Sequence, residues 1–348
     1  MKAIVRVIAR GRLMLLVTIL TVCVASIGFG AEKKTYSFKW NNYQSPETHY
    51  EVANSAKCIK EVEAAFGGRM KIKQYIGGSL LSGKETLEGL GSGVADIANY
   101  YQPYGVGLNP LFDMAGLPAV WTGSDHMMRA ERSMEMIKWW DEILKPLNIK
   151  MLGLYCCGEG WIFTRKDRMV TVPSDLKAKV LRGYKMFERA IAANGGSTVM
   201  LGTGEVYEAI MRSVIHGVIT NPNAALDNLW CEVAPWGVLY PFNLIEACTI
   251  MNLDSWNKLT DEDKDLLLKT AMANHAAFAQ EMIAGIKPGQ KTYEGLKKYA
   301  TLHAPTAGET ALWTKFCEPV RDDFRKSLPS DKHRQQFDNF LAIANKYK

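Results

Sequence analysis

The chain has 348 residues, of which 47% are hydrophobic, 42 are basic and 36 are acidic. Basic and acidic residues are interspersed without the basic runs of nucleic-acid-binding proteins, so the composition argues against a nucleic-acid partner. The length suffices for two domains of ordinary size, each with its own core.

The N-terminus has the layout of a secretory signal. Four basic residues come first: Lys2, Arg6, Arg10 and Arg12. An apolar run over residues 13–27 and a group of small residues follow. This run has about 15 residues, fewer than the roughly 20 that span a bilayer, so we expect residues 1–30 to be a signal peptide cleaved after Gly30 or Ala31. A retained membrane anchor and a lipoprotein attached at Cys23 are the alternatives.

The predicted mature protein is nearly neutral and carries no second membrane-spanning run. The signal holds four of the 42 basic residues and none of the 36 acidic ones, which leaves a net charge of about +2. We therefore expect a soluble, periplasmic protein after export.

In the first part of the mature chain, β-rich runs alternate with helical patterns, which is typical of an α/β fold. The predicted strands are residues 35–40, 70–75, 95–100 and 150–156. The predicted helices are residues 47–66, 84–90 and 125–144. In the first of these helices apolar residues recur at three- and four-residue spacing until Gly67 and Gly68 end it.

The same alternation continues to the C-terminus. The predicted strands are residues 161–165, 179–182, 197–200, 218–220 and 247–252. The predicted helices include residues 204–212, 260–284, 309–325 and 331–347. Thr260 is expected to cap the longest helix, where the acidic residues that follow favour its positive end. Pro288 is expected to end or kink that helix.

Six cysteines follow the signal: Cys58, Cys156, Cys157, Cys231, Cys248 and Cys317. Their spacing matches neither a dense disulfide scaffold nor a zinc motif. We expect free, buried thiols.

Several strings, in order over nearly the whole mature chain, resemble one protein family. They are residues 77–100 (GGSLLSGKETLEGLGSGVADIANY), 110–120 (PLFDMAGLPAV), 172–182 (VPSDLKAKVLR), 204–222 (GEVYEAIMRSVIHGVITNP) and 247–263 (ACTIMN followed by SWNKLTDED). Each string is weak alone, but together they resemble the solute-binding subunits of tripartite ATP-independent periplasmic (TRAP) transporters.

This resemblance implies a two-lobed α/β architecture with crossover strands and a long connecting helix, closing like a hinge on a small organic acid. The implied partners are integral membrane TRAP transporter subunits, to which the solute is delivered. We expect residues 31–158 and 247–300 to form lobe I, and residues 159–246 and 301–348 to form lobe II.

The resemblance also implies the main ligand contact, Arg182. Its guanidinium, at the end of a strand, would pair with a carboxylate through two charge-assisted hydrogen bonds. A salt bridge at the surface or between the lobes is the alternative. The family often has a further Arg about 20 residues earlier, where this chain has Glu159 within residues 158–161. An acid there favours a ligand with one carboxylate plus hydroxyl or amine groups.

Polar and aromatic residues at other strand ends complete the predicted site. Thr220 and Asn221 end one strand, and Asn42 follows the first. One of Tyr100 and Tyr101 is expected to face the cleft while the other joins the core. Two tryptophans are candidates for stacking on the ligand, with core packing as the alternative: Trp161 and Trp230.

Patterns for catalysis and cofactors are weak. Residues 78–85 (GSLLSGKE) match a phosphate loop until Glu85 replaces its Ser or Thr, and the six histidines show no zinc-binding pair. We therefore expect neither cofactor nor metal, and a binding protein rather than an enzyme. A binding module of a sensor and a periplasmic enzyme are the alternative functions.

Overall fold

The computed structural model describes residues 33–114 and 116–348, of which residues 37–348 form one unit. Its strands lie in one mixed sheet: β1 (Tyr36–Asn41), β2 (Met70–Tyr75), β3 (Ile97–Tyr100), β4 (Ile149–Thr164), β5 (Val180–Arg182), β6 (Ser197–Val199), β7 (Gly217–Thr220), β8 (Trp236–Asn252) and β9 (Thr301–His303). The strand order is β2-β1-β3-β8-β4-β7-β5-β6, and β9 pairs with β8. β-branched and aromatic residues, which fit a pleated buried surface, supply much of these strands.

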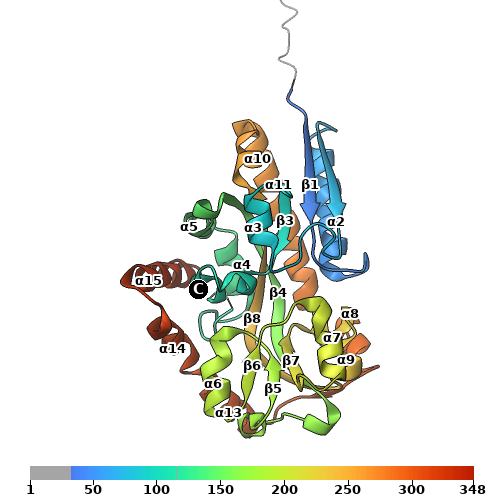
Figure 1. The fold of residues 1–348 in the computed structure, drawn as a ribbon, viewed down its shortest axis with the longest axis vertical. Helices are drawn as coiled ribbons and strands as arrows, with labels where there is room; N and C mark the ends of the chain where they lie inside the picture. The colour runs from blue at the N-terminus through green and yellow to red at the C-terminus, as the bar shows by residue number, and fades with distance from the viewer. Residues whose placement is uncertain (1–32, 115) are drawn as a thin grey trace, which may run out of the picture. The chain divides into compact units, whose positions relative to one another are not determined.

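Helices cover the sheet (Figure 1). They are α2 (Tyr50–Ala65), α3 (Thr86–Gly91), α4 (Ser124–Glu131), α5 (Met134–Leu144), α6 (Glu188–Ala193), α7 (Thr203–Met211), α8 (Pro222–Asp227), α9 (Trp230–Val233), α10 (Leu253–Asn257), α11 (Asp261–Gly285), α12 (Lys291–Leu296), α13 (Ala307–Cys317), α14 (Val320–Ser327) and α15 (Asp331–Lys346). The α/β fold class predicted from the alternating pattern is confirmed.

Two long antiparallel strands connect the halves of the sheet. β4 has 16 residues and β8 has 17, so each extends over about 50 Å. β3 pairs with the C-terminal part of β8, and β7 pairs with the C-terminal part of β4. Because β4 and β8 are antiparallel, these two contacts lie at opposite ends of the pair, and both strands belong to both lobes (Figure 1).

The middle of β4, between the lobes, departs from regular strand geometry. Its register against β8 shifts between Cys156 and Gly158 and again between Gly160 and Ile162. Gly158 has a φ of 103°, which side chains rarely adopt, and a Cβ on Gly160 would lie 2.1 Å from Asn243 Oδ1. At the first shift β4 has one extra residue, Cys157, whereas at the second shift four residues of β8, 239–242, lie opposite Trp161 of β4. The glycines therefore permit an irregular pairing where the strands pass from one lobe to the other.

Two strands predicted separately, residues 150–156 and 161–165, form the single strand β4. The glycines between them distort β4 without ending it. The strand predicted at residues 247–252 is likewise only the end of β8, which begins at Trp236.

Two predicted helices are divided in the structure. Residues 125–144 form α4 and α5, because the Ser133 hydroxyl accepts a hydrogen bond from Met136 N at 3.1 Å and caps a new helix. Residues 309–325 form α13 and α14, which separate at Pro319, a residue without a backbone N–H.

The long connecting helix is α11, whose 25 residues span about 37 Å. Its predicted N-cap is confirmed, since Thr260 Oγ1 accepts a hydrogen bond from Asp263 N at 3.2 Å. It packs against β4 and α2 and ends at Gly285, ahead of Pro288.

The C-terminal helices pack on both sides of the molecule's middle. α12 packs on α8, α14 on α6, and α15 on α4 and α5. α12 and α15 thus contact helices on the other side of the predicted lobe division, and the lobe bounds stay a prediction.

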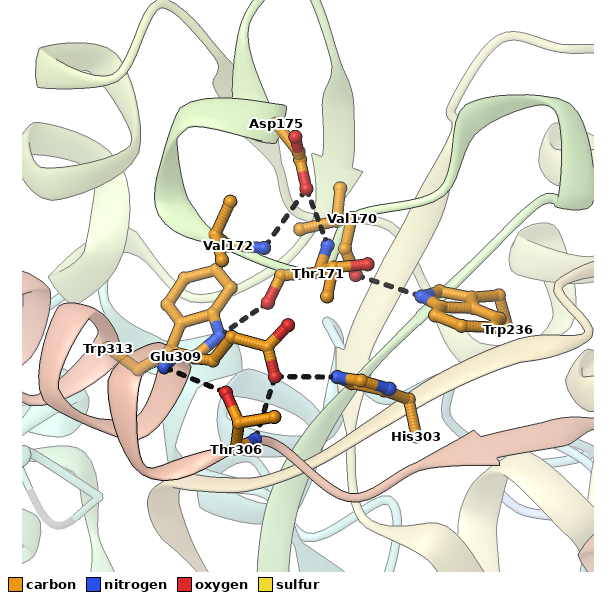
Figure 2. A network of polar contacts seen from close by, with 9 residues as sticks. All are labelled: Val170, Thr171, Val172, Asp175, Trp236, His303, Thr306, Glu309 and Trp313. Atoms are coloured by element: carbon orange, nitrogen blue, oxygen red, sulfur yellow. Dashed lines mark hydrogen bonds and ion pairs between the residues drawn. The ribbon is translucent and has the colours of Figure 1, made fainter.

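A polar network fastens α13 to the loop after β4 (Figure 2). Trp313 Nε1 donates to the Thr171 carbonyl at 2.9 Å, and Trp236 Nε1 donates to the Val170 carbonyl at 3.0 Å. His303 Nε2 and Glu309 Oε2 are in hydrogen-bonding contact at 2.9 Å. Segments more than 100 residues apart in sequence are thereby held together.

In the part of the chain that the structure describes, no helix combines the length and the apolar character needed to cross a membrane. The predicted signal segment, residues 1–30, lies outside the described residues.

Candidate functional site

A cavity lies at the middle of the two long antiparallel strands, β4 and β8. Cys157 of β4 and Ile245 and Ala247 of β8 form its floor. One wall comes from the N-terminal half of the sheet: Tyr43, Gln44, Tyr50, Glu51, Tyr101 and Tyr104. The other comes from the second half: Arg182, Tyr184, Thr203, Thr220, Asn221 and Trp230. A cavity walled by residues from both halves of a sheet is a typical place for a small-molecule ligand.

Arg182 is a buried cation in this cavity. It ends β5, which lies between β6 and β7, and its residue is only 4% exposed. Its Nε and Nη2 both donate to the Leu201 carbonyl at 3.3 Å, and its Cζ lies 5.8 Å from the Trp230 ring centroid. The end of a strand is where α/β folds place ligands.

The charge of Arg182 has no acidic partner among the described residues, where its hydrogen bonds go to one backbone carbonyl. An arginine stays protonated even when buried, and burying an unpaired charge carries a free-energy cost of several kcal/mol. The guanidinium retains donors that an anion entering the cavity can accept.

Tyrosines surround this cation. The ring centroids of Tyr101 and Tyr184 are 5.7 Å apart, those of Tyr101 and Tyr104 are 5.8 Å apart, and those of Tyr43 and Tyr104 are 5.6 Å apart. Burial raises the pKa of Tyr184 to about 12, despite the opposing effect of Arg182. The Tyr101 and Tyr184 phenols, whose pKa values burial raises, are therefore neutral at physiological pH and can bind a ligand through hydrogen bonds and ring faces.

Hydrogen bonds between the two walls close the cavity. Asn221 Nδ2 donates to the Tyr50 hydroxyl at 3.0 Å, while Asn221 Oδ1 caps α8 by accepting from Ala224 N at 2.7 Å. The Tyr104 and Thr203 hydroxyls are 3.3 Å apart. These contacts join segments from opposite ends of the sheet.

Glu51, in the first turn of α2, places a buried carboxyl group in the cavity wall. Its Oε2 accepts from Gln44 Nε2 at 3.0 Å, and its Oε1 accepts from the Tyr155 hydroxyl at 3.4 Å. Burial raises the pKa of Glu51 to about 7, although both hydrogen bonds lower it in part.

Five of the residues selected from sequence line the cavity together: Arg182, Tyr101, Thr220, Asn221 and Trp230. The other four lie outside it. Asn42 donates to Ser55 Oγ at 3.1 Å and to Asn99 Oδ1 at 3.4 Å, within the protein. Tyr100 faces the core beside Phe112.

Glu159 and Trp161 bond to each other instead of facing the cavity. Trp161 Nε1 donates to Glu159 Oε2 at 3.2 Å, and the Trp161 ring packs in a second hydrophobic cluster with Phe163. The bulges in β4 set the faces on which side chains beyond Cys156 lie, and these shifts are not visible as alternation in the sequence.

Sequence reasoning missed the aromatic and polar residues near the N-terminus of α2 and after β3 and β5. Tyr184 lies two residues after Arg182, and Tyr104 lies three after Tyr101. Their position beside predicted ligand residues was an available signal. Tyr43 and Gln44 follow the predicted residue Asn42 and carried the same signal, whereas Glu51 gave none, because polar residues at the start of a helix are typical of its entry.

The described residues contain no group of three or more His, Cys, Asp or Glu side chains arranged to hold a metal ion. Burial lowers the pKa of His49 and of His275 to about 3, so both are neutral at physiological pH. Burial also raises the pKa of Cys157 well above its usual value, which keeps this cavity thiol protonated. All six described cysteines are buried and free.

Comparisons with known proteins agree with this geometry. A family model described as bacterial extracellular solute-binding protein, family 7, matches residues 41–327. A solute-binding protein from Chromohalobacter salexigens is 26% identical over 216 residues, which cover 61% of this chain and 63% of that protein, under two thirds of its length. The C4-dicarboxylate-binding periplasmic protein DctP of Rhodobacter capsulatus is 23% identical over 302 residues, which cover 84% of this chain and 87% of that protein.

A solved structure shows the same fold. The crystal structure of a TRAP periplasmic solute-binding protein from Chromohalobacter salexigens, with bound D-glucuronate, has a TM-score of 0.76 at 19% identity. The match covers 88% of this chain and 99% of that chain. The predicted resemblance and the two-lobed architecture are confirmed, and the extracellular family agrees with the predicted periplasmic location. This chain belongs to family 7 of the bacterial extracellular solute-binding proteins and has the fold of a TRAP-transporter solute receptor.

Proposed function

We propose that this protein captures a small carboxylate-bearing solute in the cavity between its lobes, with Arg182 as the anchor, and delivers it to the membrane subunits of a TRAP transporter. The single observation that carries the proposal is that Arg182, a residue only 4% exposed, has no acidic partner among the described residues. A carboxylate supplies the missing charge and accepts two parallel hydrogen bonds.

Closure of the lobes would be driven by binding energy. The solute contacts both walls only when they meet, so it binds the closed state more tightly and shifts the population toward that state. Asn221 with Tyr50, and Tyr104 with Thr203, would stabilise the same state. The irregular middle of β4 and β8 is the proposed hinge, and it lies close to the predicted lobe bounds at residues 158–159 and 246–247.

We propose further that the solute leaves unchanged. The cavity nucleophile Cys157 is a protonated thiol, because burial raises its pKa. Tyr101 and Tyr184 are neutral donors because burial raises their pKa, and they bind without transferring protons at physiological pH.

The test is a screen of the purified mature protein against sugar acids, hydroxy acids, amino acids and dicarboxylates, read as a rise in melting temperature. A ligand at a hundredfold excess over its Kd stabilises a protein by about 2.7 kcal/mol. Arg182→Ala is expected to weaken the binding of every responding acid by about 30-fold or more, because the bound carboxylate loses its buried partner.

Arg212→Ala is the matched control. Its side chain is 76% exposed at the C-terminal end of α7, outside the cavity, so binding should change by less than about threefold. Binding that is unchanged in Arg182→Ala contradicts the proposed anchor. Enzymatic conversion of a responding acid by the pure protein contradicts the receptor role.

A further inference from the structure

The cavity has a second polar group on the wall facing Arg182. Gln44 and Glu51 line this wall, and each residue is more than nine-tenths buried. Gln44 Nε2 donates to Glu51 Oε2 at 3.0 Å, and the Tyr155 hydroxyl donates to Glu51 Oε1 at 3.4 Å. These two contacts hold the carboxyl group in place at the edge of the cavity.

The hydrogen bond to Glu51 fixes the orientation of the Gln44 amide. With Nε2 directed at the carboxylate, Gln44 Oε1 remains buried and without a hydrogen-bond partner among the described residues. Buried polar atoms are rarely left without a partner, and a carbonyl oxygen can only accept. This wall therefore presents an unused amide acceptor beside a carboxyl group and calls for an N–H or O–H donor.

The distribution of charge in the cavity points the same way. Arg182 is its basic lining residue and Glu51 its acidic one, and tyrosines, other polar residues and apolar residues make up the rest. Burial raises the pKa of Glu51 to about 7, so the group is partly ionised at neutral pH. A solute with carboxylates at both ends would place one of them against this acid and a carbonyl oxygen, and like charges in a buried site repel.

We infer that Glu51 and Gln44 form a subsite for a hydrogen-bond donor of the solute, a hydroxyl or an amino group. The solute class is then a monocarboxylate that carries such a donor, and dicarboxylates are disfavoured. This inference rests on the proposed function, since it takes the Arg182 end of the cavity as the carboxylate subsite. Glu159, which the sequence offered as the acid near Arg182, bonds to Trp161 outside the cavity.

The test uses acids of matched length in calorimetry and thermal melting. The four-carbon set is butanoate, 2- and 4-hydroxybutanoate, 2- and 4-aminobutanoate, and succinate. The six-carbon set is hexanoate, gluconate, D-glucuronate, 6-aminohexanoate and adipate. The best donor-bearing acid is expected to bind about 10- to 100-fold tighter than the unsubstituted acid and the dicarboxylate of the same length, which is the effect of one charge-assisted hydrogen bond. Comparing hydroxy with amino acids identifies the donor.

Variants then assign the preference to this wall. Glu51→Gln and Gln44→Leu should each remove most of it, lowering the affinity for the best acid by about 10- to 100-fold and that for unsubstituted acids by less than about threefold. Glu47→Gln, at an exposed position of the same loop, should change neither.

The outcomes separate the two proposals. If acids bind through Arg182 but dicarboxylates or unsubstituted acids bind as tightly as donor-bearing ones, this inference is overturned and the receptor function stands. The same holds if the donor preference persists in both wall variants. If binding of every acid is independent of Arg182, or no acid of either set binds, the carboxylate subsite fails and the inference fails with it.

Discussion

Asp113 is expected to make the stability of this protein depend strongly on pH. It ends the short helix η2 (Pro110–Asp113), is 2% exposed, and its Oδ1 has no hydrogen-bond partner among the described residues. Burial raises the pKa of Asp113 to about 8, although a hydrogen bond from the Met186 backbone and the charge of Lys185 lower it in part. Replacing it with Asn keeps the shape of the protonated acid and removes the titration.

The direction in which stability changes with pH follows from proton binding. An acid with a raised pKa in the folded state holds its proton there while the unfolded chain releases it, so the free energy of unfolding falls as the pH rises from about 4 to about 8. Each pH unit in this window corresponds to about 1.4 kcal/mol, or about 3 kcal/mol between pH 5 and pH 7. The free energy of unfolding of Asp113→Asn, measured relative to that of wild type, should therefore be about 3 kcal/mol higher at pH 7 than at pH 5.

Urea unfolding at pH 5, 6 and 7 measures this difference directly. Asp265→Asn is the control, because this aspartate is exposed on α11 and its removal should leave the pH dependence unchanged within about 0.5 kcal/mol. A constant difference between Asp113→Asn and wild type across these pH values would refute the argument that the buried carboxyl is protonated.

Other predictions concern packing and contacts between the lobes. Gly153→Ala should destabilise the protein by about 1–3 kcal/mol in urea unfolding, since its Cβ would lie 2.5 Å from Nδ1 of the buried His275; an unchanged midpoint would show that the helix carrying this ring yields freely. Ser133→Ala should lower stability by about 1 kcal/mol through loss of the α5 cap, with Ser133→Asp restoring it. Lys84→Ala should change stability and acid binding by less than about 1 kcal/mol, because its 3.5 Å ion pair with Glu205 is half-exposed; a larger loss of binding would make that pair part of the closing mechanism.

Local sequence patterns predicted the helices and strands well where a clear signal marks the end of each one. Thr260 with its acidic neighbours located α11 within a residue, and alternation located β2 at residues 70–75. Interruptions were harder to predict. A serine cap at Ser133 divides one helix, and glycine bulges near Gly158 leave a strand continuous, because both outcomes depend on hydrogen bonds to partners that the pattern does not show.

The candidate site was predictable in its basic half. Arg182 came from a family string, and Tyr101, Thr220 and Asn221 from strand ends, and all four line the cavity. The acidic half was not predictable. An acid in the first turn of a helix is ordinarily solvated and favoured by the helix dipole, and only the tertiary structure shows that Glu51 is buried.

The two shared strands have a consequence for biogenesis. Ile97 pairs with Met251, so the N-terminal sheet lacks a neighbour until most of the polypeptide has been made. Such sequence-distant pairings slow folding, because a large loop must close before the contact forms. A nascent chain that cannot complete its sheet early stays unfolded for longer. Secretion through a narrow protein-conducting channel requires this unfolded state.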